Sequence, residues 1–399
     1  MNRSPDPPIS KSPSLKILLS AGEASGDIYG AQLIDALRQL GPGSTFFGMG
    51  GEKMRASGAE LLVHAHEVAV VGLVEVLTHL PGIRRRFKHL VAEAARRKPD
   101  AAILIDFPDF NLRLARELHR LGIPVFYFVS PQIWAWRIGR VKQIKKYVRK
   151  MIVIFPFEQE FYRRHGVEVS YVGHPLAYAP PPPQISREEF AAKHFLDPKK
   201  QWIALLPGSR RKELGFNIER MLWAAEMLKD QSGDFQFVMP VASTLNKDWL
   251  VQKLRHTWMS PVVVELTDNA RATLMHARAA VVASGTATVE AALSGTPFVV
   301  VYRLAPLTWL LGRRLVKLDT FAMPNLIAGR KIVPELIQKG FTAQNVFREL
   351  KAIIPDGPAR QQMQSDLRIV QQRLRDTRNA EAPAQQAARE ILVALNQGQ

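Results

Sequence analysis

Acidic side chains follow an apolar run in the first half of the chain, at the point where a strand would end. The run AAILI leads into DFPDFN, so Asp106 stands at the predicted strand tip, with Asp109 and Asn111 close behind. Active sites of open α/β sheets gather at the carboxyl ends of strands, where a carboxylate could accept a proton from an attacking hydroxyl. Asp106 is the candidate general base and Asp109 its rival. The alternative is that both acids serve only the loop and that Asn111 caps the next helix.

A second pair of acids lies in the small-residue turn of ILLSAGEASGD. An apolar run from Ile17 enters this turn, and Glu23, Ser25, Gly26 and Asp27 follow just before a helix-period pattern. A strand that enters a helix through such a turn is an α/β building block. Two acids would repel a phosphate, so the residues alone leave the partner of this turn open.

An arginine-rich turn follows a strand candidate in the second half of the chain. The sequence WIALLPGSRRKEL places Ser209 and Arg210 just after an apolar run. An arginine at the carboxyl end of a strand could grip a diphosphate through two parallel hydrogen bonds. The alternative is a surface loop with solvated arginines.

A hydroxyl-rich turn, in VVASGTATVEAALSG, is the second candidate nucleotide contact. A predicted strand at 279–283 runs into Ser284, Gly285 and Thr286, and a helix is predicted from near Ala287 to Gly295. A helix N-terminus offers free N–H groups and a positive dipole end, while Glu290 could accept from ribose hydroxyls. The alternative is an ordinary capped helix with a favourable first-turn acid.

These residues need strands and helices that alternate along the chain. Apolar runs predict strands at 15–20, 101–105, 125–129 and 151–155, then at 202–206, 235–239, 262–266, 279–283 and 298–302. Such alternation indicates parallel sheets covered on both faces. Four consecutive prolines in AYAPPPPQISREE read as a semi-rigid linker. We predict an α/β domain at 15–178, a linker at 179–190, a second α/β domain at 191–357, and a helical segment at 358–399 that packs back on the first domain.

Composition narrows the class of protein. The 399 residues are 47% hydrophobic, include no cysteine and carry a net charge of +18. The missing cysteines exclude disulfides and cysteine-type zinc sites, and the charge favours an anionic partner. The chain has no H-E-x-x-H, Walker A or G-x-G-x-x-G motif and no D-x-D, so we predict neither a metal nor another cofactor. Without an apolar leader or an uninterrupted spanning segment, a cytoplasmic protein is expected.

Two basic segments suggest where an anionic partner binds. Trp136 and Arg137 begin a predicted basic helix in SPQIWAWRIGRVKQIKKYVRK, which suits a phosphorylated or membrane-bound substrate, although a solvated face or single-stranded nucleic acid are alternatives. The segment 68–90 is apolar with a basic tail, and we predict that it contacts a membrane surface, with buried core as the alternative. The predicted contacts are Val70, Val71, Leu73, Val74, Leu77, Leu80, Arg84, Arg85 and Arg86.

Taken together, the motifs resemble those of the lipid-A-disaccharide synthase family. They occur in the family's order over 15–335 and are AGEASGD, VVGLVEVL, DFPDFN, FVSPQIWAWR, FPFE, YVGHPL, LLPGSR, ASGTATVE, VYR and LVKLDTFAMPNLIAGR. The resemblance implies a GT-B glycosyltransferase, with two Rossmann-like parallel-sheet domains facing across a cleft. It implies that UDP-2,3-diacylglucosamine and 2,3-diacylglucosamine 1-phosphate give the β-1,6-linked disaccharide 1-phosphate and UDP. The reaction would be inverting and independent of metal.

The resemblance also implies residue roles. Asp106 would be the general base, and Arg210, Glu290 and Asn325 would serve the UDP-sugar together with the turns at 209 and 284–286. The first domain would then face the acceptor, through Glu23, Ser25, Gly26, Asp27, Asp109, Asn111, Trp136 and Arg137.

The expected partners are the two lipid substrates and the anionic inner face of the inner membrane, not nucleic acid, and an oligomer is left open. The rivals are another GT-B enzyme acting on UDP-N-acetylglucosamine, such as the peptidoglycan glycosyltransferase or the 2-epimerase, and a basic nucleic-acid-binding protein. The motifs AGEASGD and SPQIWAWR argue against the other GT-B enzymes. A nucleic-acid-binding protein would leave Asp106 and Glu290 without a role.

Overall fold

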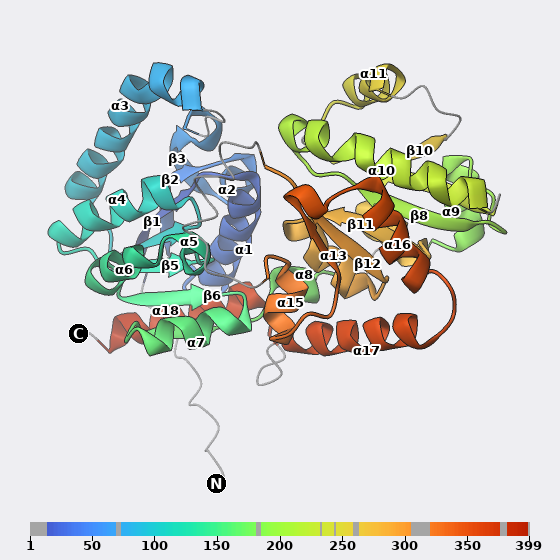
Figure 1. Ribbon diagram of the computed structural model, residues 1–399. Helices are drawn as coiled ribbons and strands as arrows, with labels where there is room; N and C mark the ends of the chain where they lie inside the picture. The colour runs from blue at the N-terminus through green and yellow to red at the C-terminus, as the bar shows by residue number, and fades with distance from the viewer. Residues whose placement is uncertain are drawn as a thin grey trace, which may run out of the picture. The chain divides into compact units, whose positions relative to one another are not determined.

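The computed structural model divides into two compact units, each built around one β-sheet (Figure 1). Unit 1 comprises Met1–Tyr178 with Asp376–Gln399, and unit 2 comprises Ala179–Arg375. The structure describes residues 14–68, 73–180, 185–231, 234–242, 245–257, 263–304, 320–375 and 381–397. The last helix thus belongs to the first unit, although the chain reaches it only after building the second.

The sheet of unit 1 has seven parallel strands in the order β3-β2-β1-β4-β5-β6-β7. Its strands are β1 (Lys16–Ala21), β2 (Thr45–Gly50), β3 (Ala59–His64), β4 (Ala101–Ile105), β5 (Val125–Phe128), β6 (Lys150–Val153) and β7 (Val169–Tyr171). The strand order reverses between β1 and β4. Open sheets bind ligands at such a reversal, beyond the carboxyl ends of the strands.

Side chains of the strands of unit 1 alternate between two hydrophobic cores, as the period of two requires. Leu18, Leu104 and Tyr127 point to one core, and Ile17 and Ile103 to the other. The first face is covered by α3 (Leu73–Arg97), α4 (Pro108–Arg120), α6 (Val141–Tyr147) and α7 (Pro156–Arg164). The second face is covered by α1 (Ala24–Leu40), α2 (Glu52–Ala56) and α18 (Pro383–Asn396). Shorter helical turns of this unit are Ala65–Glu67, α5 (Ile133–Trp136), Ile138–Arg140 and α8 (Pro175–Tyr178).

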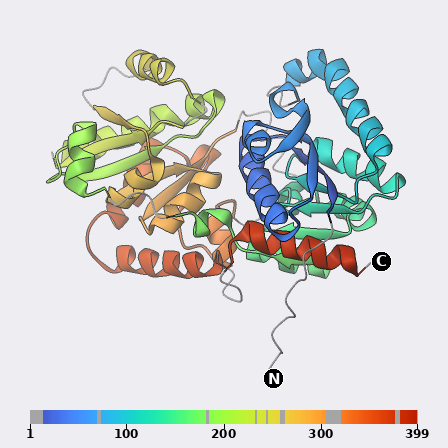
Figure 2. The ribbon, with the colours of Figure 1, turned by 180° about the vertical axis from the view of Figure 1, so that it is seen from behind.

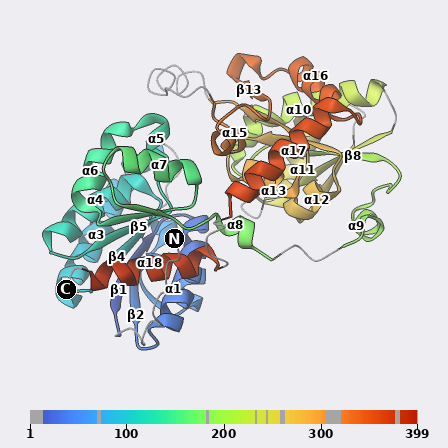
Figure 3. The ribbon, with the colours of Figure 1, turned by 90° about the horizontal axis from the view of Figure 1, so that it is seen from below.

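The C-terminal helix α18 is held to unit 1 by both apolar and polar contacts. It packs beside α1 (Figures 2 and 3), with Ile391 fully buried. The Glu390 carboxylate accepts hydrogen bonds from Lys150 Nζ at 2.6 Å and from Ser170 Oγ at 2.8 Å. Because Lys150 is itself buried, this ion pair is screened less than one on the surface.

The sheet of unit 2 has six parallel strands in the order β10-β9-β8-β11-β12-β13. They are β8 (Gln201–Leu206), β9 (Phe235–Pro240), β10 (Val264–Thr267), β11 (Ala279–Ala283), β12 (Phe298–Tyr302) and β13 (Glu335–Ile337). The order again reverses, between β8 and β11. The helices are α9 (Arg187–His194), α10 (Arg211–Gln231), α11 (Lys247–Thr257), α12 (Ala270–His276), α13 (Thr286–Ser294), α15 (Met323–Ala328), α16 (Ala343–Ile353) and α17 (Pro358–Arg373), with a helical turn at Gln338–Gly340.

The predicted pair of parallel α/β sheets is confirmed, but four strands escaped the sequence pattern. The missed strands are β2, β3, β7 and β13. β7 and β13 have only three residues each, and β2 contains Gly48 at a register shift against β3. Gly48 has φ +144°, and a Cβ there would lie 2.0 Å from the Leu19 carbonyl oxygen. Close backbone approach therefore requires the glycine that hides this strand from an apolar-run search.

One predicted helical segment also differs from the structure. The basic helix expected after Trp136 is divided into α5, a helical turn and α6, and Lys150 lies in β6 as a buried strand residue. Pro81 and Gly82, in the segment predicted to contact a membrane, lie inside the 25-residue helix α3. Within the described part of the chain, no helix is both long and apolar enough to cross a bilayer.

Candidate active site

Asp106 occupies the turn directly after β4, at the strand-order reversal of unit 1. Its backbone is left-handed, with φ +44°, and so is that of Phe107, with φ +50°. The backbone N–H of Asp106 lies 3.3 Å from both the Phe128 and the Val129 carbonyl oxygens, which ties this turn to the end of β5. The side chain is half-buried. The prediction that Asp106 follows the end of a strand is therefore confirmed.

The electrostatic environment makes Asp106 a weak acid. Burial raises the pKa of Asp106 to about 7, and the negative charge of Glu23 adds to the effect. Glu23 is exposed at the N-terminal end of α1, in the turn after β1, and its side chain makes no capping hydrogen bond. A carboxylate with a pKa near 7 is a far stronger base than an ordinary aspartate and can still ionise at neutral pH.

Asn111 does not cap α4, because the cap position belongs to Phe107. Its side chain is fully buried between the ends of β1 and β4. Asn111 Oδ1 accepts from Ser20 Oγ at 2.6 Å, and Nδ2 donates to the Asp106 carbonyl oxygen at 2.8 Å. The amide is thus engaged with the protein itself, and its effect on a substrate would be indirect.

Asp109, the rival base, faces a different environment. Its side chain is 68% exposed, and its Oδ1 binds Arg137 Nη1 at 2.7 Å and also Arg140. Partial burial alone would raise its pKa, but the two guanidinium groups outweigh that effect and hold the pKa of Asp109 below its usual value. An acid held ionised in this way is a poor proton acceptor. Arg137 is engaged in the same ion pair, and the side chain of Trp136 lies outside the described atoms.

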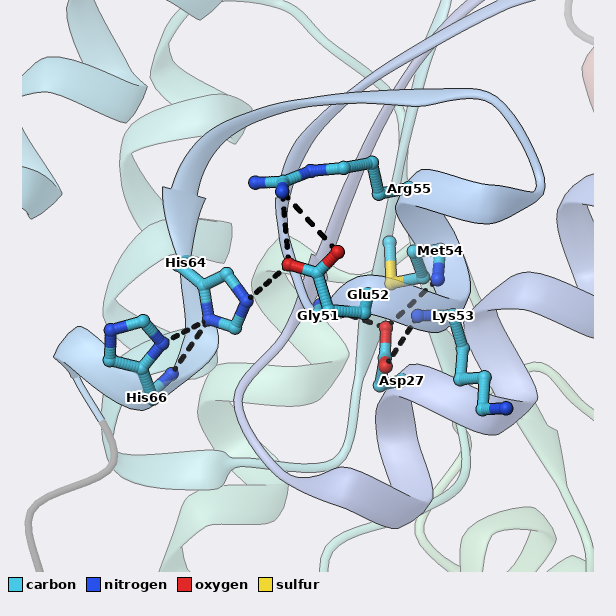
Figure 4. Close-up of polar contacts among 8 residues, drawn as sticks. All are labelled: Asp27, Gly51, Glu52, Lys53, Met54, Arg55, His64 and His66. Atoms are coloured by element: carbon cyan, nitrogen blue, oxygen red, sulfur yellow. Dashed lines mark hydrogen bonds and ion pairs between the residues drawn. The ribbon is translucent and has the colours of Figure 1, made fainter.

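Asp27 is used inside unit 1, as Figure 4 shows. Its carboxylate accepts hydrogen bonds from the backbone N–H groups of Gly51, Lys53 and Met54 at 2.8–3.0 Å. It therefore caps the N-terminus of α2 from a distant part of the chain. The turn after β2, which begins at Gly51, is held against α1 in this way, and Asp27 is only 8% exposed.

Of the remaining small residues of the first turn, two glycines are closely packed and the serine is exposed. A Cβ on Gly26 would lie 3.3 Å from Ala21 Cβ, so this glycine lets α1 pack on the sheet. Ser25 is exposed on the first turn of α1. Gly22 lies under the Phe107 ring, which a Cβ would approach to 2.3 Å. The turns after β1 and β4 therefore pack directly against each other.

A buried acid after β6 was missed by the sequence reasoning. Glu158, in the first turn of α7, is 1% exposed. Its carboxylate accepts from Trp134 Nε1 at 3.1 Å and from the Phe155 backbone N–H at 3.3 Å. Burial raises the pKa of Glu158 to about 8, and Asp106 adds negative charge to its surroundings. The signal was the motif FPFE after a strand, which reads as Pro at the first helical position and Glu at the third.

In unit 2 the turn after β8 carries Ser209 and Arg210. Arg210 is exposed, and its guanidinium lies 3.5 Å from the Glu213 carboxylate. Ser209 is exposed too, and its backbone N–H donates to Glu213 Oε2 at 3.2 Å. Burial raises the pKa of Tyr302 at the end of β12. The negative charge of Glu213 adds to this effect, and the positive charge of Arg210 opposes it. The ring of Tyr302, in the motif VYR, stacks on that of Phe321, in the motif LVKLDTFAMPNLIAGR.

The neighbouring turn after β11 leads into the N-terminus of α13. Gly285 is the N-cap with φ +145°, and an added Cβ would meet nothing within 4 Å. Ser284 is half-buried and Thr286 exposed, whereas Thr288 is buried and donates to the Gly285 carbonyl oxygen. The helix spans Thr286–Ser294 and ends at Gly295, close to the predicted bounds.

Two further residues predicted for the donor side lie deeper in unit 2. Glu290, in the second turn of α13, is half-buried; burial raises its pKa, and the Arg271 charge opposes this. Asn325 is fully buried: Nδ2 donates to Glu335 Oε1 at 2.6 Å, and Oδ1 accepts from the Ile332 N–H at 2.7 Å. Asn325 therefore holds the chain around β13 in place, and sequence reasoning could not show that its amide is already satisfied.

The predicted membrane contacts are only partly described. Val70 and Val71 lie outside the described residues, as do the side chains of Leu73, Val74, Leu77 and Leu80. In the described part of α3, Arg84 and Arg85 are exposed, and Arg86 pairs with Glu67. Among the described residues, no group of three or more His, Cys, Asp and Glu side chains is arranged to hold a metal ion.

Comparison with known proteins connects this geometry to a family. The family model described as lipid-A-disaccharide synthetase matches residues 17–391. The lipid-A-disaccharide synthase of Koribacter versatilis is 54% identical over 384 residues, which cover 95% of this chain and 98% of that protein. The lipid-A-disaccharide synthase of Acidobacterium capsulatum is 51% identical over 370 residues, covering 90% and 91%.

Solved structures show the same fold at low identity. The UDP-GlcNAc 2-epimerase from Neisseria meningitidis, bound to UDP-GlcNAc, gives a TM-score of 0.63 at 15% identity, covering 96% of this chain and 100% of that chain. CalG4, the calicheamicin glycosyltransferase, gives 0.55 at 16% identity, covering 96% and 98%. The predicted GT-B architecture is thereby confirmed.

The two aspartates near the β4 turn should affect stability with opposite signs. Between the unfolded pKa near 4 and the folded pKa near 7, Asp106 ionises more easily in the unfolded chain, so wild-type stability falls as pH rises. Asp106→Asn should therefore melt at a higher temperature than wild type at pH 8, and the difference should vanish near pH 4. Thermal unfolding followed by circular dichroism from pH 4 to 8 measures this.

Asp109→Asn is the matched control. The lowered pKa of Asp109 stabilises the fold above its unfolded pKa, and this contribution is lost as pH falls through the folded value. This variant should be less stable than wild type at pH 8, with a smaller difference at low pH. An Asp106→Asn protein no more stable than wild type at pH 8 would contradict the raised pKa of Asp106.

Proposed function

Because the chain belongs to the lipid-A-disaccharide synthase family, and is therefore a glycosyltransferase of lipid A synthesis, we propose that it joins UDP-2,3-diacylglucosamine to 2,3-diacylglucosamine 1-phosphate. The acceptor 6-hydroxyl oxygen attacks C1 of the donor sugar, and the bond from C1 to the phosphate oxygen breaks. UDP leaves with the bonding electrons, and the hydroxyl proton passes to a base. A single displacement of this kind inverts the anomeric carbon and gives the β-1,6-linked product.

Asp106 is the proposed base, and its environment is the observation that carries the proposal. The carboxyl group is half-buried, stands beyond the carboxyl end of β4, and has a pKa near 7. Taking up a proton removes a charge that the site disfavours, so proton transfer from the acceptor is helped by the same burial. Asp109 is less suited because its arginine partners favour the ionised form. Exposed Glu23 and Ser25 are left to meet acceptor hydroxyls.

The donor nucleotide is assigned to unit 2. Arg210 is exposed beside the turn after β8, and the open N-terminus of α13 follows the adjacent strand β11. A guanidinium and a helix N-terminus together would stabilise the charge that develops on the departing diphosphate. Glu290 is the proposed ribose contact. In this scheme no metal ion is needed for departure of UDP.

Replacing the base should reduce turnover far more than donor binding. Asp106→Asn keeps the shape of the side chain and removes its basicity, so kcat should fall by about 10²–10⁴. The measurement is disaccharide and UDP formation from the two purified lipid substrates. The affinity for UDP, measured by calorimetry, should stay close to that of wild type.

The pH profile gives an independent check on the base. The wild-type kcat/KM, which reports the pKa of the free enzyme, should rise with pH to a plateau with a midpoint near 7, because only ionised Asp106 accepts a proton. Glu23→Gln removes a negative charge that raises this pKa, so it should move the midpoint to lower pH. Near-normal turnover in Asp106→Asn would reject Asp106 as the base.

Removing the arginine beside β8 should weaken donor binding. Arg210→Ala is expected to raise the Kd for UDP by about 10- to 100-fold, since a charged hydrogen bond to phosphate contributes roughly 1.5–3 kcal/mol. Lys212→Ala removes the same charge two residues away on an exposed position and should change the Kd little. Calorimetric titration with UDP in the presence of EDTA distinguishes the two. Equal Kd values for Arg210→Ala and wild type, or an absolute Mg²⁺ requirement, would contradict the assignment.

We also propose that the start of α3 docks on the anionic inner face of the inner membrane. Ile83, Phe87 and Leu90 pack toward the core of unit 1, whereas Arg84 and Arg85 are exposed on the same helix. The two arginines would meet anionic headgroups while the segment before them meets the apolar region. Such docking would bring an enzyme with two acylated substrates to the surface that holds them.

Charge reversal on α3 should release the protein from anionic vesicles. Each basic residue near such a surface contributes on the order of 1 kcal/mol, so Arg84→Glu with Arg85→Glu should lower the partition coefficient at least tenfold. Arg348→Glu with Lys351→Glu on α16 changes the charge equally at exposed positions of unit 2 and serves as the control. Sedimentation with vesicles of defined anionic content is the measurement. Unchanged binding of the α3 variant would place the contact elsewhere.

A further inference from the structure

Three non-glycine residues near the proposed base have left-handed backbones. Asp106, Phe107 and Val129 have φ values of +44°, +50° and +61°. Side chains with a Cβ disfavour this region, most of all β-branched ones such as valine, so the surrounding structure must hold these residues there. These three residues lie at the ends of two adjacent strands, β4 and β5, and hydrogen bonds to Asp106 show what holds its backbone.

Two buried side chains converge on the carbonyl oxygen of Asp106. Tyr127 donates its hydroxyl to this oxygen at 2.5 Å, and Asn111 Nδ2 donates to it at 2.8 Å. Both donors are fully buried, so water cannot replace either of them without opening the core. They come from different elements: Tyr127 from β5 and Asn111 from α4.

The Asn111 side chain is itself fixed by the neighbouring strands. Its Nδ2 also lies 3.1 Å from the carbonyl oxygens of Ser20 and Ile105, while Oδ1 accepts from the buried Ser20 hydroxyl. On the other side of the turn, the Phe107 ring packs onto Gly22, where no larger residue fits. The peptide that joins Asp106 to Phe107 is thus held by its carbonyl oxygen and by the following side chain.

We propose that Tyr127 and Asn111 are positioning residues, which orient the Asp106 carboxylate by clamping the backbone carbonyl of the same residue. Rotation of this peptide toward an ordinary right-handed or extended conformation would break both hydrogen bonds and turn the carboxylate away. The inference rests on the proposed role of Asp106 as the base. It assigns to two buried side chains an effect on turnover without any contact to either substrate.

Tyr127→Phe is the primary test, because it removes one hydroxyl and preserves the ring in the core. We expect kcat to fall on the order of tenfold, since small displacements of a catalytic group have effects of this size or larger. The KM values for both lipids and the Kd for UDP should stay within a factor of about two. Asn111→Ala should have a larger effect on kcat. Because it removes more hydrogen bonds, it is assayed only at temperatures where circular dichroism shows it folded.

Tyr162→Phe is the matched control. Tyr162 is fully buried in the same core, and its hydroxyl also makes one internal hydrogen bond, to Ser130 Oγ at 2.8 Å. Its contact does not involve Asp106. If loss of a buried hydroxyl acts only through stability, both variants should melt at lower temperatures and keep the wild-type kcat. Selective loss of kcat in Tyr127→Phe supports the clamp.

A double-mutant cycle separates this inference from the proposed function. In an Asp106→Asn background, Tyr127→Phe should cause no further loss of kcat, because it acts through the group already removed. Additive losses, or a wild-type kcat in Tyr127→Phe, would overturn the clamp while Asp106→Asn still reports on the base. Near-normal turnover in Asp106→Asn alone would reject the base, and the clamp with it.

Discussion

The parallel pairing of β1 with β4 is the constraint on which the rest of the candidate site depends. The register places Ala21 opposite Ile105, so the next residues of both strands must emerge at the same edge. This is why Glu23 raises the pKa of Asp106, why Gly22 must lack a side chain beneath Phe107, and why Asn111 can bond to both strand ends. Unit 2 repeats the arrangement, since β8 pairs with β11 and brings together the turns that carry Arg210 and Gly285.

Sequence patterns located the turns at the ends of β1, β4, β8 and β11 better than they predicted the contacts of each side chain. Asp106 was singled out because it directly follows a buried apolar run, at the edge of an open sheet where active sites gather. Asp27 has the same residue type in a similar turn, yet it caps α2, which follows a strand hidden by its own glycines. No local pattern contains that contact, because its partners are more than twenty residues away along the chain.

The two buried asparagine side chains also show that the sequence does not reveal the contacts of a side chain. Asn111 and Asn325 lie in motifs that the family resemblance singled out, and both have their polar atoms satisfied by the protein. Residue type and position could not distinguish a side chain that binds a ligand from one that holds the ligand's surroundings. The contact of Tyr127 was missed for a related reason. Within an apolar run this residue is interpreted as core, and only the fold shows that its hydroxyl donates to the Asp106 carbonyl oxygen.

The path of the chain through α18 has a consequence for how such proteins can be divided and recombined. Unit 2 is one continuous insertion, whereas unit 1 is completed only when Ile391 and Glu390 return to it after residue 376. A gene fragment that stops at Tyr178 would leave α1 uncovered, and the buried Lys150 would keep only Glu168, at 3.4 Å, as an ion-pair partner. Exchanging the second unit between relatives therefore requires two junctions, one near residue 178 and one near 376, and a single crossover cannot yield an intact first unit.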